Sequence, residues 1–229
     1  MRELIKKLSD LGIKLLVNER NELIIRAPHS VMTDELLSEI KKYKNELISY
    51  LSIKPISRDM ELPLSYAQER LWFIDQLEPN SSAYNLPGAI RLRGEIKPEI
   101  LIEAFTRIIK RHENLRTVFQ TRESRPVQVI KAPEEFNMQI IDLTDISEEE
   151  KEIKAKQIAT KEAQTPFNLS EGPLLRAKLI KMVEGDYIIV VNMHHIISDG
   201  WSIGILIQEI GKIIEALLKK EEPQLPPLP

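Results

Sequence analysis

The sequence predicts an α/β (α+β) protein in which a small mixed domain precedes a larger domain with a central sheet. Patterns with helical spacing alternate along the chain with short apolar, β-branched runs that are typical of strands. The polar, Pro-containing stretch SIKPISRDMELP interrupts this alternation near residue 55. We therefore expect a first domain at residues 1–54, a linker at 55–62 and a second domain at 63–229.

The composition excludes several classes of protein. Of the 229 residues 42% are hydrophobic and 29% are charged, which suits a protein that buries a core. The net charge of −3 argues against nucleic-acid binding, because phosphate contacts need a basic surface. The absence of cysteine excludes disulfides and suits the cytoplasm. The most apolar stretch, 201–220, contains Glu209, Lys212 and Glu215, so we expect a core-facing helix and no membrane span.

The first domain is predicted to contain a helix, a hairpin and then one or two helices. Leucine and isoleucine at helical spacing predict a helix over 2–11, and Gly12 follows where it can stop. Residues 13–27, IKLLVNERNELIIRA, have the pattern of two short strands around a polar turn. Thr33, followed by acidic residues, predicts the N-cap of a helical stripe that breaks near 42–44.

This order of elements, ending in LLSEIKKYKNELISYL, resembles the TubC-type N-terminal docking domain of nonribosomal peptide synthetases. The resemblance implies that the hairpin edge takes the C-terminal tail of an upstream synthetase or polyketide synthase subunit. A homodimer that covers this edge is the other possibility. Lys14, Arg20 and Arg26 lie on or beside the hairpin, so we expect the tail to be acidic.

The second domain is predicted from alternating helix and strand patterns. Helices are expected over 62–77, 97–115, 146–167 and 201–220. Strands are expected over 89–96, 116–120, 126–130, 174–182 and 186–195, the last two forming a hairpin at Glu184 and Gly185. Ser147 is the expected N-cap of the third helix, and the Pro-rich end at 221–229 is not expected to pack.

Two adjacent histidines, His194 and His195, stand at the end of the last predicted strand. Adjacent strand residues face opposite sides of a sheet, so the pair does not readily bind one metal ion. Only His29 and His112 could add further imidazoles, and we expect no metal site.

The segment that follows, Asp199 to Ser202, allows a catalytic and a structural interpretation. Loops between a strand and a helix are common places for reacting groups. In the structural interpretation Asp199 or Ser202 caps the last helix, and Gly200 supplies an unusual backbone angle.

Three stretches decide in favour of the catalytic interpretation. SYAQERLWFI at 65–74, RHENLRTVF at 111–119 and MHHIISDGWS at 193–202 resemble, in this order, the first three core motifs of condensation domains of nonribosomal peptide synthetases. Heterocyclisation domains carry spaced aspartates in place of the histidines and are excluded. Epimerisation domains share the histidines but follow a carrier domain, so they are disfavoured.

The resemblance implies amide-bond formation between two thioesters that are tethered to phosphopantetheine on carrier domains, with no cofactor bound directly. His195 then acts at the attacking amine, as a general base or as an electrostatic anchor, because an imidazole pKa of about 6.5 suits a proton acceptor. His194, which faces away, is structural. Asp199 is expected to hold the loop through a buried ion pair with Arg111, Arg116 or an arginine beyond this sequence.

The resemblance assigns supporting roles to the other motif residues. The N–H of Gly200 is expected to contact the substrate or the oxyanion. Trp201 is expected to pack against the core, and Ser202 to cap the helix. Ser65, Gln68 and Arg70 are expected to be structural, and the ISDGWS version of the motif favours an L-configured donor and an L-configured acceptor.

Condensation domains consist of two lobes that resemble chloramphenicol acetyltransferase, and residues 63–229 correspond to the first lobe. We expect the chain to be part of a longer protein and to be inactive without the second lobe. Two other functions remain open. The docking domain could be the working element with the lobe as a passenger, or the lobe could be a stand-alone acyltransferase whose oligomer completes the site.

Overall fold

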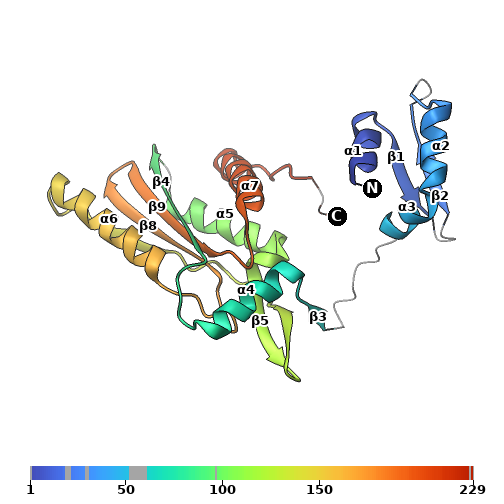
Figure 1. Cartoon of the computed structure of the whole chain (residues 1–229). Coiled ribbons are helices and arrows are strands. Elements are labelled where there is room, and N and C mark those ends of the chain that lie inside the picture. Colours follow the sequence, from blue (N-terminus) through green and yellow to red (C-terminus); the bar gives the residue numbers. More distant parts are fainter. Residues whose placement is uncertain are drawn as a thin grey trace. The chain divides into compact units, whose positions relative to one another are not determined.

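A computed structural model describes residues 2–18, 22–28, 31–51, 61–95, 97–226 and 228. The chain forms two compact units, Met1–Met60 and Glu61–Pro229. Both units combine helices with a sheet (Figure 1), so the predicted fold class is confirmed. Most of the predicted linker at 55–62 lies outside the described residues.

The first unit has the predicted order of elements. They are α1 (Arg2–Asp10), β1 (Lys14–Val17), β2 (Leu23–Arg26), α2 (Asp34–Lys42) and α3 (Lys44–Leu51). The Thr33 hydroxyl accepts a hydrogen bond from the Leu36 N–H at 3.2 Å and caps α2, as its sequence context predicts. The small core is formed by Leu4, Leu8, Ile13, Leu36, Ile40 and Leu47.

The second unit contains two sheets and four α-helices among its described residues. The elements of its first half are β3 (Leu62–Pro63), α4 (Tyr66–Leu77), β4 (Asn85–Arg93), α5 (Pro98–Arg111), a 3₁₀ helix (Glu113–Arg116), β5 (Thr117–Arg122) and β6 (Arg125–Ile130). Those of its second half are β7 (Gln139–Asp142), α6 (Glu148–Gln164), β8 (Leu175–Val183), β9 (Asp186–His194) and α7 (Gly200–Lys219). The strand orders are β3-β6-β5 and β4-β9-β8-β7. All strand pairs are antiparallel except the parallel pair of β7 and β8.

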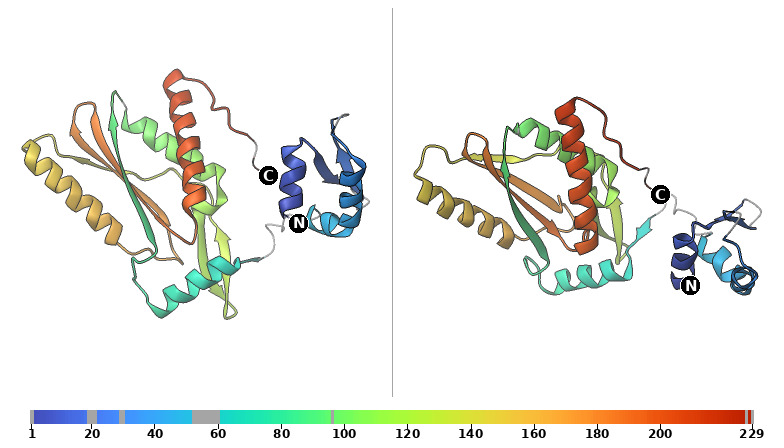
Figure 2. Two further views of the ribbon diagram at one scale, coloured as in Figure 1. Left: turned by 45° about the horizontal axis from the view of Figure 1, so that its top comes forward. Right: turned by 90° about the horizontal axis from the view of Figure 1, so that it is seen from above.

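The four-stranded sheet is covered on both faces. Leu179 and Ile189 belong to the main core, which also contains residues of α5 and α7. Ile180 and Val190, one position further along each strand, pack in a second cluster with Ala155 of α6. Figure 2 shows α6 on one side of the sheet and α5 with α7 on the other. Burial on both faces explains why β8 and β9 are apolar over most of their length.

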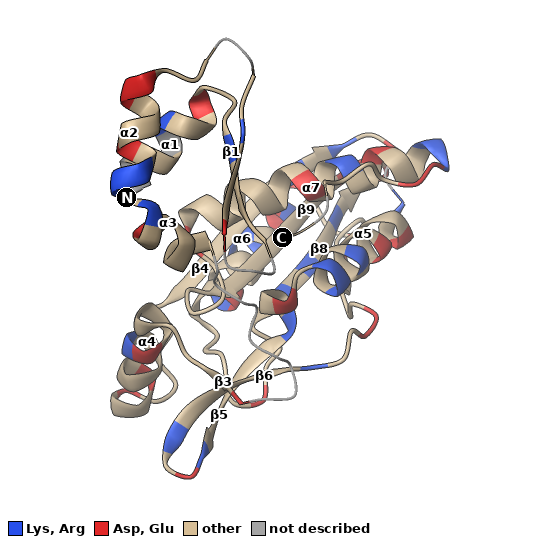
Figure 3. Ribbon diagram, turned by 90° about the vertical axis from the view of Figure 1, so that its right-hand side faces the viewer, with Lys and Arg blue, Asp and Glu red and all other residues tan. Residues whose placement is uncertain are grey.

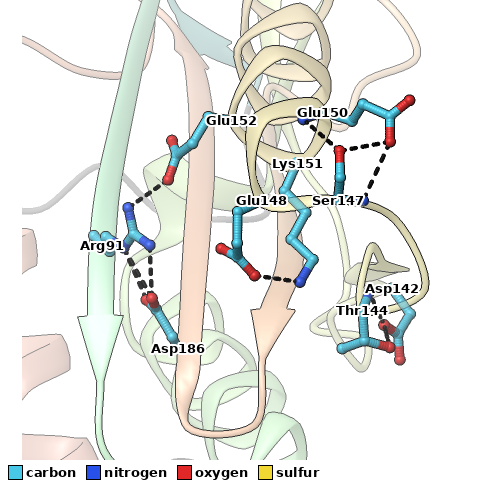
Figure 4. A network of polar contacts seen from close by, with 9 residues as sticks. All are labelled: Arg91, Asp142, Thr144, Ser147, Glu148, Glu150, Lys151, Glu152 and Asp186. Carbon is cyan, nitrogen blue, oxygen red and sulfur yellow. Dashed lines mark hydrogen bonds and ion pairs between the residues drawn. The ribbon is translucent and has the colours of Figure 1, made fainter.

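Helix α6 is fixed to the sheet at its N-terminal end by polar contacts (Figure 4). Arg91 of β4 forms ion pairs with Asp186 of β9 at 2.6 Å and with Glu152 of α6 at 2.7 Å. The predicted cap is also present, because Ser147 accepts the Glu150 N–H and Glu150 accepts the Ser147 N–H. These contacts lie at the end of β9 opposite to the two histidines.

Four predictions about the second unit differ from the structure. Strand β7 (Gln139–Asp142) was not predicted. Strand β4 begins at Asn85 rather than at 89, because an edge strand tolerates Pro87 and Gly88. Residues 62–63 form β3 rather than the start of a helix. The Pro-rich end packs after all: Arg107 pairs with Glu222 at 3.0 Å and Leu225 packs on the core.

Within the described ranges no helix combines the length and the apolar character that crossing a membrane requires.

Candidate functional site

The two histidines stand at the end of β9, an inner strand of the four-stranded sheet, but differ in exposure. The backbone N–H of His194 donates to the Leu174 carbonyl at 3.0 Å, and that of His195 donates to the Tyr84 carbonyl at 2.9 Å. The His194 side chain is buried, with 3% of its surface exposed, whereas His195 is exposed. This difference agrees with the alternation expected at the end of a strand.

The hydrogen bond of His195 determines which ring nitrogen carries the proton. Its Nδ1 lies 2.6 Å from the backbone carbonyl oxygen of Ser198. A carbonyl oxygen only accepts hydrogen bonds, so Nδ1 is the donor and bears a hydrogen. In the neutral imidazole Nε2 then has the free lone pair and can accept a proton.

His194 lies in a cage between two aromatic side chains. The Phe167 ring meets it edge-on at a centroid distance of 6.1 Å, and the Tyr84 ring lies at 6.4 Å. Nδ1 of His194 accepts the Ile196 N–H at 3.1 Å. Burial, assisted by the charge of His195, lowers the pKa of His194 to about 4. His194 is therefore neutral near pH 7, with its hydrogen on Nε2.

Asp199 caps helix α7. Its Oδ1 accepts the Ser202 N–H at 2.8 Å, and the Ser202 hydroxyl oxygen accepts the Asp199 N–H at 2.8 Å. Backbone and side-chain hydrogen bonds from Ser202 lower the pKa of Asp199. The carboxylate is exposed, and the tight turn directs it to the helix N-terminus.

The predicted buried ion pair of Asp199 with Arg111 or Arg116 is therefore wrong, and a pair with an arginine beyond this sequence stays a prediction. Arg111 binds Glu209, and Nη1 of Arg116 donates to the Lys131 carbonyl at 2.5 Å. No lysine or arginine in the described part of the chain forms an ion pair with Asp199.

The second motif fastens α5 to α7. Nε of Arg111 lies 3.0 Å from Oε2 of Glu209, and Nε2 of His112 lies 2.6 Å from the same oxygen. Glu209 is buried, which alone raises the pKa of its carboxyl group, but the hydrogen bonds from Arg111 and His112 outweigh burial and lower it. Sequence analysis did not predict that Glu209 binds Arg111 and His112. An acidic residue on the apolar face of 201–220 was a signal for a buried partner of this kind.

The residues at the start of α7 differ in part from expectation. Gly200 is the first helical residue and is not among the residues with a positive φ angle, so it supplies no unusual backbone angle. A Cβ atom at Gly200 would meet nothing within 4 Å. Trp201, the second residue of α7, is 82% exposed, so the prediction that it packs against the core is wrong.

The first motif caps α4 and reaches the histidine loop. Ser65 accepts the Gln68 N–H at 3.3 Å and the Gln68 amide oxygen accepts the Ser65 N–H at 2.9 Å. Nε2 of Gln68 also donates to the Ile196 carbonyl at 3.5 Å. Arg70 is exposed on α4. These contacts agree with structural roles for Ser65 and Gln68, whereas the role of Arg70 stays a prediction.

No cluster of three metal-binding side chains occurs among the residues that the structure describes. His29 and Arg20, which sequence analysis named, lie outside these residues.

The hairpin of the first unit presents a mixed outer face. Lys14 pairs with Arg26 and Leu16 pairs with Ile24, and all four side chains are exposed. Figure 3 shows the basic residues of the two strands side by side. The alternate positions, Leu15, Val17, Leu23 and Ile25, are half-buried, and all but Val17 pack against the core of the unit.

Comparison with known proteins agrees with both resemblances. The model of the condensation domain family matches residues 58–229, and that of the TubC N-terminal docking domain matches residues 1–52. A polypeptide of the linear gramicidin synthase of Brevibacillus parabrevis is 46% identical over 177 residues, which are 77% of this chain and 2% of that protein. Bacitracin synthase 2 of Bacillus licheniformis is 35% identical over 211 residues, covering 87% of this chain and 8% of that protein.

A solved structure has the same fold in its matching part. The starter condensation domain of rhizomide synthetase RzmA superimposes with a TM-score of 0.67 at 27% identity, covering 73% of this chain and 40% of that chain. The chain thus spans less than half of the condensation structure and a few per cent of the curated relatives. The chain belongs to the condensation domain family of nonribosomal peptide synthetases and carries a TubC-type docking domain in front of the condensation segment.

Proposed function

We propose that the second unit supplies the histidine-bearing half of a site that joins two carrier-tethered acyl groups by an amide bond, and that His195 accepts the proton of the attacking amine. The observation that carries this proposal is the 2.6 Å contact of Nδ1 with the Ser198 carbonyl. It leaves the unprotonated Nε2 on an exposed side chain at the end of a rigid sheet.

The reaction follows from the chemistry of thioesters. The amine of the acceptor aminoacyl thioester attacks the carbonyl carbon of the donor thioester, so that a C–N bond forms and the C–S bond breaks. The amine proton passes to Nε2 of His195 and from there to the leaving thiolate of the donor phosphopantetheine. Aminolysis of a thioester is thermodynamically favourable, so catalysis consists mainly of positioning the two tethered reactants.

The start of α7 is the proposed place for the negative charge of the intermediate. The N–H groups in the first turn of a helix have no intrahelical acceptors, and in α7 Asp199 accepts that of Ser202. Gly200, the first residue of α7, has no side chain to block an approaching oxyanion. The ISDGWS sequence favours an L-configured donor and an L-configured acceptor.

The test is single-turnover condensation by an enzyme that contains the complete condensation domain, with loaded donor and acceptor carriers. His195→Ala should lower the rate by about 100-fold or more, within the range for loss of a general base. Added imidazole should restore part of the rate, because it replaces the missing proton acceptor. Undiminished turnover by His195→Ala would refute the proposal, and a loss that imidazole does not restore would assign His195 an electrostatic role.

We further propose that the first unit binds the C-terminal tail of an upstream synthetase or polyketide synthase subunit along the hairpin. The paired Lys14 and Arg26 beside the paired Leu16 and Ile24 support a tail strand that presents acidic and apolar residues on one face. Ordering a short tail costs free energy, so we expect a dissociation constant on the order of 10 μM.

Titration of the chain with the C-terminal peptide of the upstream subunit tests this docking. Lys14→Glu should weaken binding about 10-fold and reduce its salt dependence. Lys41→Glu makes the same charge change on the exposed side of α2 and should bind like the unmodified chain. Equal binding by both variants would place the tail elsewhere, and a hairpin-mediated homodimer would appear as a change of mass on sedimentation.

A further inference from the structure

Three side chains of the sheet bind the carboxyl end of helix α6. Nδ2 of Asn192 donates to the Glu162 carbonyl at 2.7 Å, and Nδ2 of Asn85 donates to the Ala163 carbonyl, also at 2.7 Å. Arg176 donates to the carbonyls of Thr165 and Pro166 at 2.7 and 3.1 Å. The last carbonyls of a helix lack intrahelical donors, so these contacts fix the end of α6 to the sheet.

The same three side chains stand beside His194. In the strand register Asn85 is opposite His194, and Arg176 is opposite Asn192, two residues before His194. Directly opposed residues of antiparallel strands share one face of the sheet. The Oδ1 atoms of Asn85 and Asn192 are buried without a hydrogen-bond partner in the described structure.

Arg176 connects the end of α6 to the cage around His194. Its Nε lies 2.6 Å from Oε1 of the buried Glu162, and its guanidinium carbon lies 3.7 Å from the centroid of the Phe167 ring. Phe167 is 5% exposed and meets the His194 ring edge-on at 6.1 Å. The planar guanidinium thus stacks on Phe167 and binds the helix end at once, which an ammonium group cannot do.

The contacts continue from His194 to His195. Nδ1 of His194 accepts a hydrogen bond from the Ile196 N–H at 3.1 Å, and His195 lies between these two residues in the chain. A shift of the His194 ring therefore moves the main chain on both sides of His195. The 2.6 Å hydrogen bond from His195 to the Ser198 carbonyl depends on the position of this main chain.

We propose that Arg176 is a positioning residue for His195, which acts by holding Phe167 and the end of α6 against His194. The inference rests on the proposed role of His195 in catalysis. The alternative is that Arg176 only neutralises the buried Glu162. Lys178 distinguishes these two explanations. Its Nζ lies 2.9 Å from Oε2 of Glu162, so it neutralises the same carboxylate, but within the described chain it makes none of the contacts of Arg176 with Phe167 and the helix end.

The test is ¹⁵N NMR of the imidazole nitrogens in the 229-residue chain at pH 8. The unmodified chain should show His195 with its hydrogen on Nδ1 only. Arg176→Lys keeps the charge but loses the stacking, and it should shift the His195 nitrogens toward the averaged values of a mixture of tautomers. Lys178→Met, the matched control, should leave the His195 signals unchanged.

The same variants in an enzyme with the complete condensation domain give the functional result. We expect Arg176→Lys to slow single-turnover condensation by about 10- to 100-fold, the cost of a displacement on the order of 1 Å in a positioned group. The NMR result does not depend on activity, so it stands even if His195 proves not to be the proton acceptor.

Either of two NMR results would overturn the inference. Unchanged His195 signals in Arg176→Lys would show that Arg176 does not position the ring. An equal shift in Lys178→Met would assign the effect to the charge of Glu162. If Arg176→Lys does not fold, Phe167→Leu decides by the same signals, because it keeps the pair of Arg176 with Glu162.

Discussion

Acidification from pH 7 to pH 5 should destabilise the second unit through one buried side chain, His194. Burial in the cage of Tyr84 and Phe167 lowers the pKa of His194 to about 4, against an ordinary value of 6.5. As the pH falls, the unfolded chain therefore binds a proton before the folded chain does. The stability from the neutral, buried ring is fully present above pH 6.5 and is lost as the pH falls toward 4.

The size of the effect follows from the two pKa values. At pH 5 the imidazole is mostly charged in the unfolded chain and mostly neutral in the folded chain. Protonation therefore favours the unfolded chain over the folded chain by a factor of about 30, which lowers the free energy of unfolding by about 2 kcal/mol. Glu209, whose pKa is lowered, loses its stabilising contribution only below about pH 4.5, so pH 5 separates the histidine from the carboxylates.

Urea unfolding followed by tryptophan fluorescence measures this loss. The chain has two tryptophans, Trp72 and Trp201, and both belong to the second unit, so the signal reports that unit alone. His194→Asn removes the imidazole but keeps an acceptor for the Ile196 N–H. The unmodified chain should lose about 2 kcal/mol more than His194→Asn between pH 7 and pH 5.

The control is His195→Asn, which removes the exposed neighbouring imidazole and leaves the buried one. It should lose nearly as much stability on acidification as the unmodified chain, because burial and not the charge of His195 is the larger cause of the lowered pKa of His194. Equal losses in the unmodified chain and in His194→Asn would refute the reasoning from burial.

Three further results are expected. Asp199→Ala should lower the melting temperature slightly without precipitating the protein, because an exposed helix cap and not a buried ion pair is lost, and Asp199→Asn should restore most of the loss. Glu209→Gln should lower the free energy of unfolding of the second unit in urea by about 2 kcal/mol, because it weakens the hydrogen bonds of the buried carboxylate with Arg111 and His112. The control Glu215→Gln, on the exposed side of α7, should leave this free energy nearly unchanged. The 229 residues alone, given loaded donor and acceptor carriers, should form no dipeptidyl thioester, because they span 40% of a solved condensation domain chain; product above background would contradict this.

Local patterns were sufficient to predict most elements of the fold. The apolar run before the histidines, the caps at Thr33 and Ser147 and the stop at Gly12 each depend on neighbouring residues only. Strand β7 and the first four residues of β4 were missed. Their pairing partners are remote in sequence, and Pro87 and Gly88 are not typical of a strand.

The sequence predicted those features of the candidate site that depend on local structure, but not those that depend on tertiary contacts. Alternation along a strand was enough to expect His194 and His195 in different environments. Whether Asp199 binds an arginine or a helix terminus depends on how tightly the loop turns, and a motif does not reveal that. The contacts of Arg176 with Phe167 join segments that are brought together only by the sheet, so no sequence pattern marked them.

For the proposed role of His195 as proton acceptor, its hydrogen bond to the Ser198 carbonyl has a consequence. Nδ1 donates a hydrogen whether the ring is neutral or has taken up a proton on Nε2, so one acceptor serves both states. The bond becomes stronger when the ring is charged, at the moment when the intermediate needs a fixed partner. In the proposed mechanism the loop therefore has no need to rearrange between receiving the proton and returning it, and a single rigid geometry serves both steps.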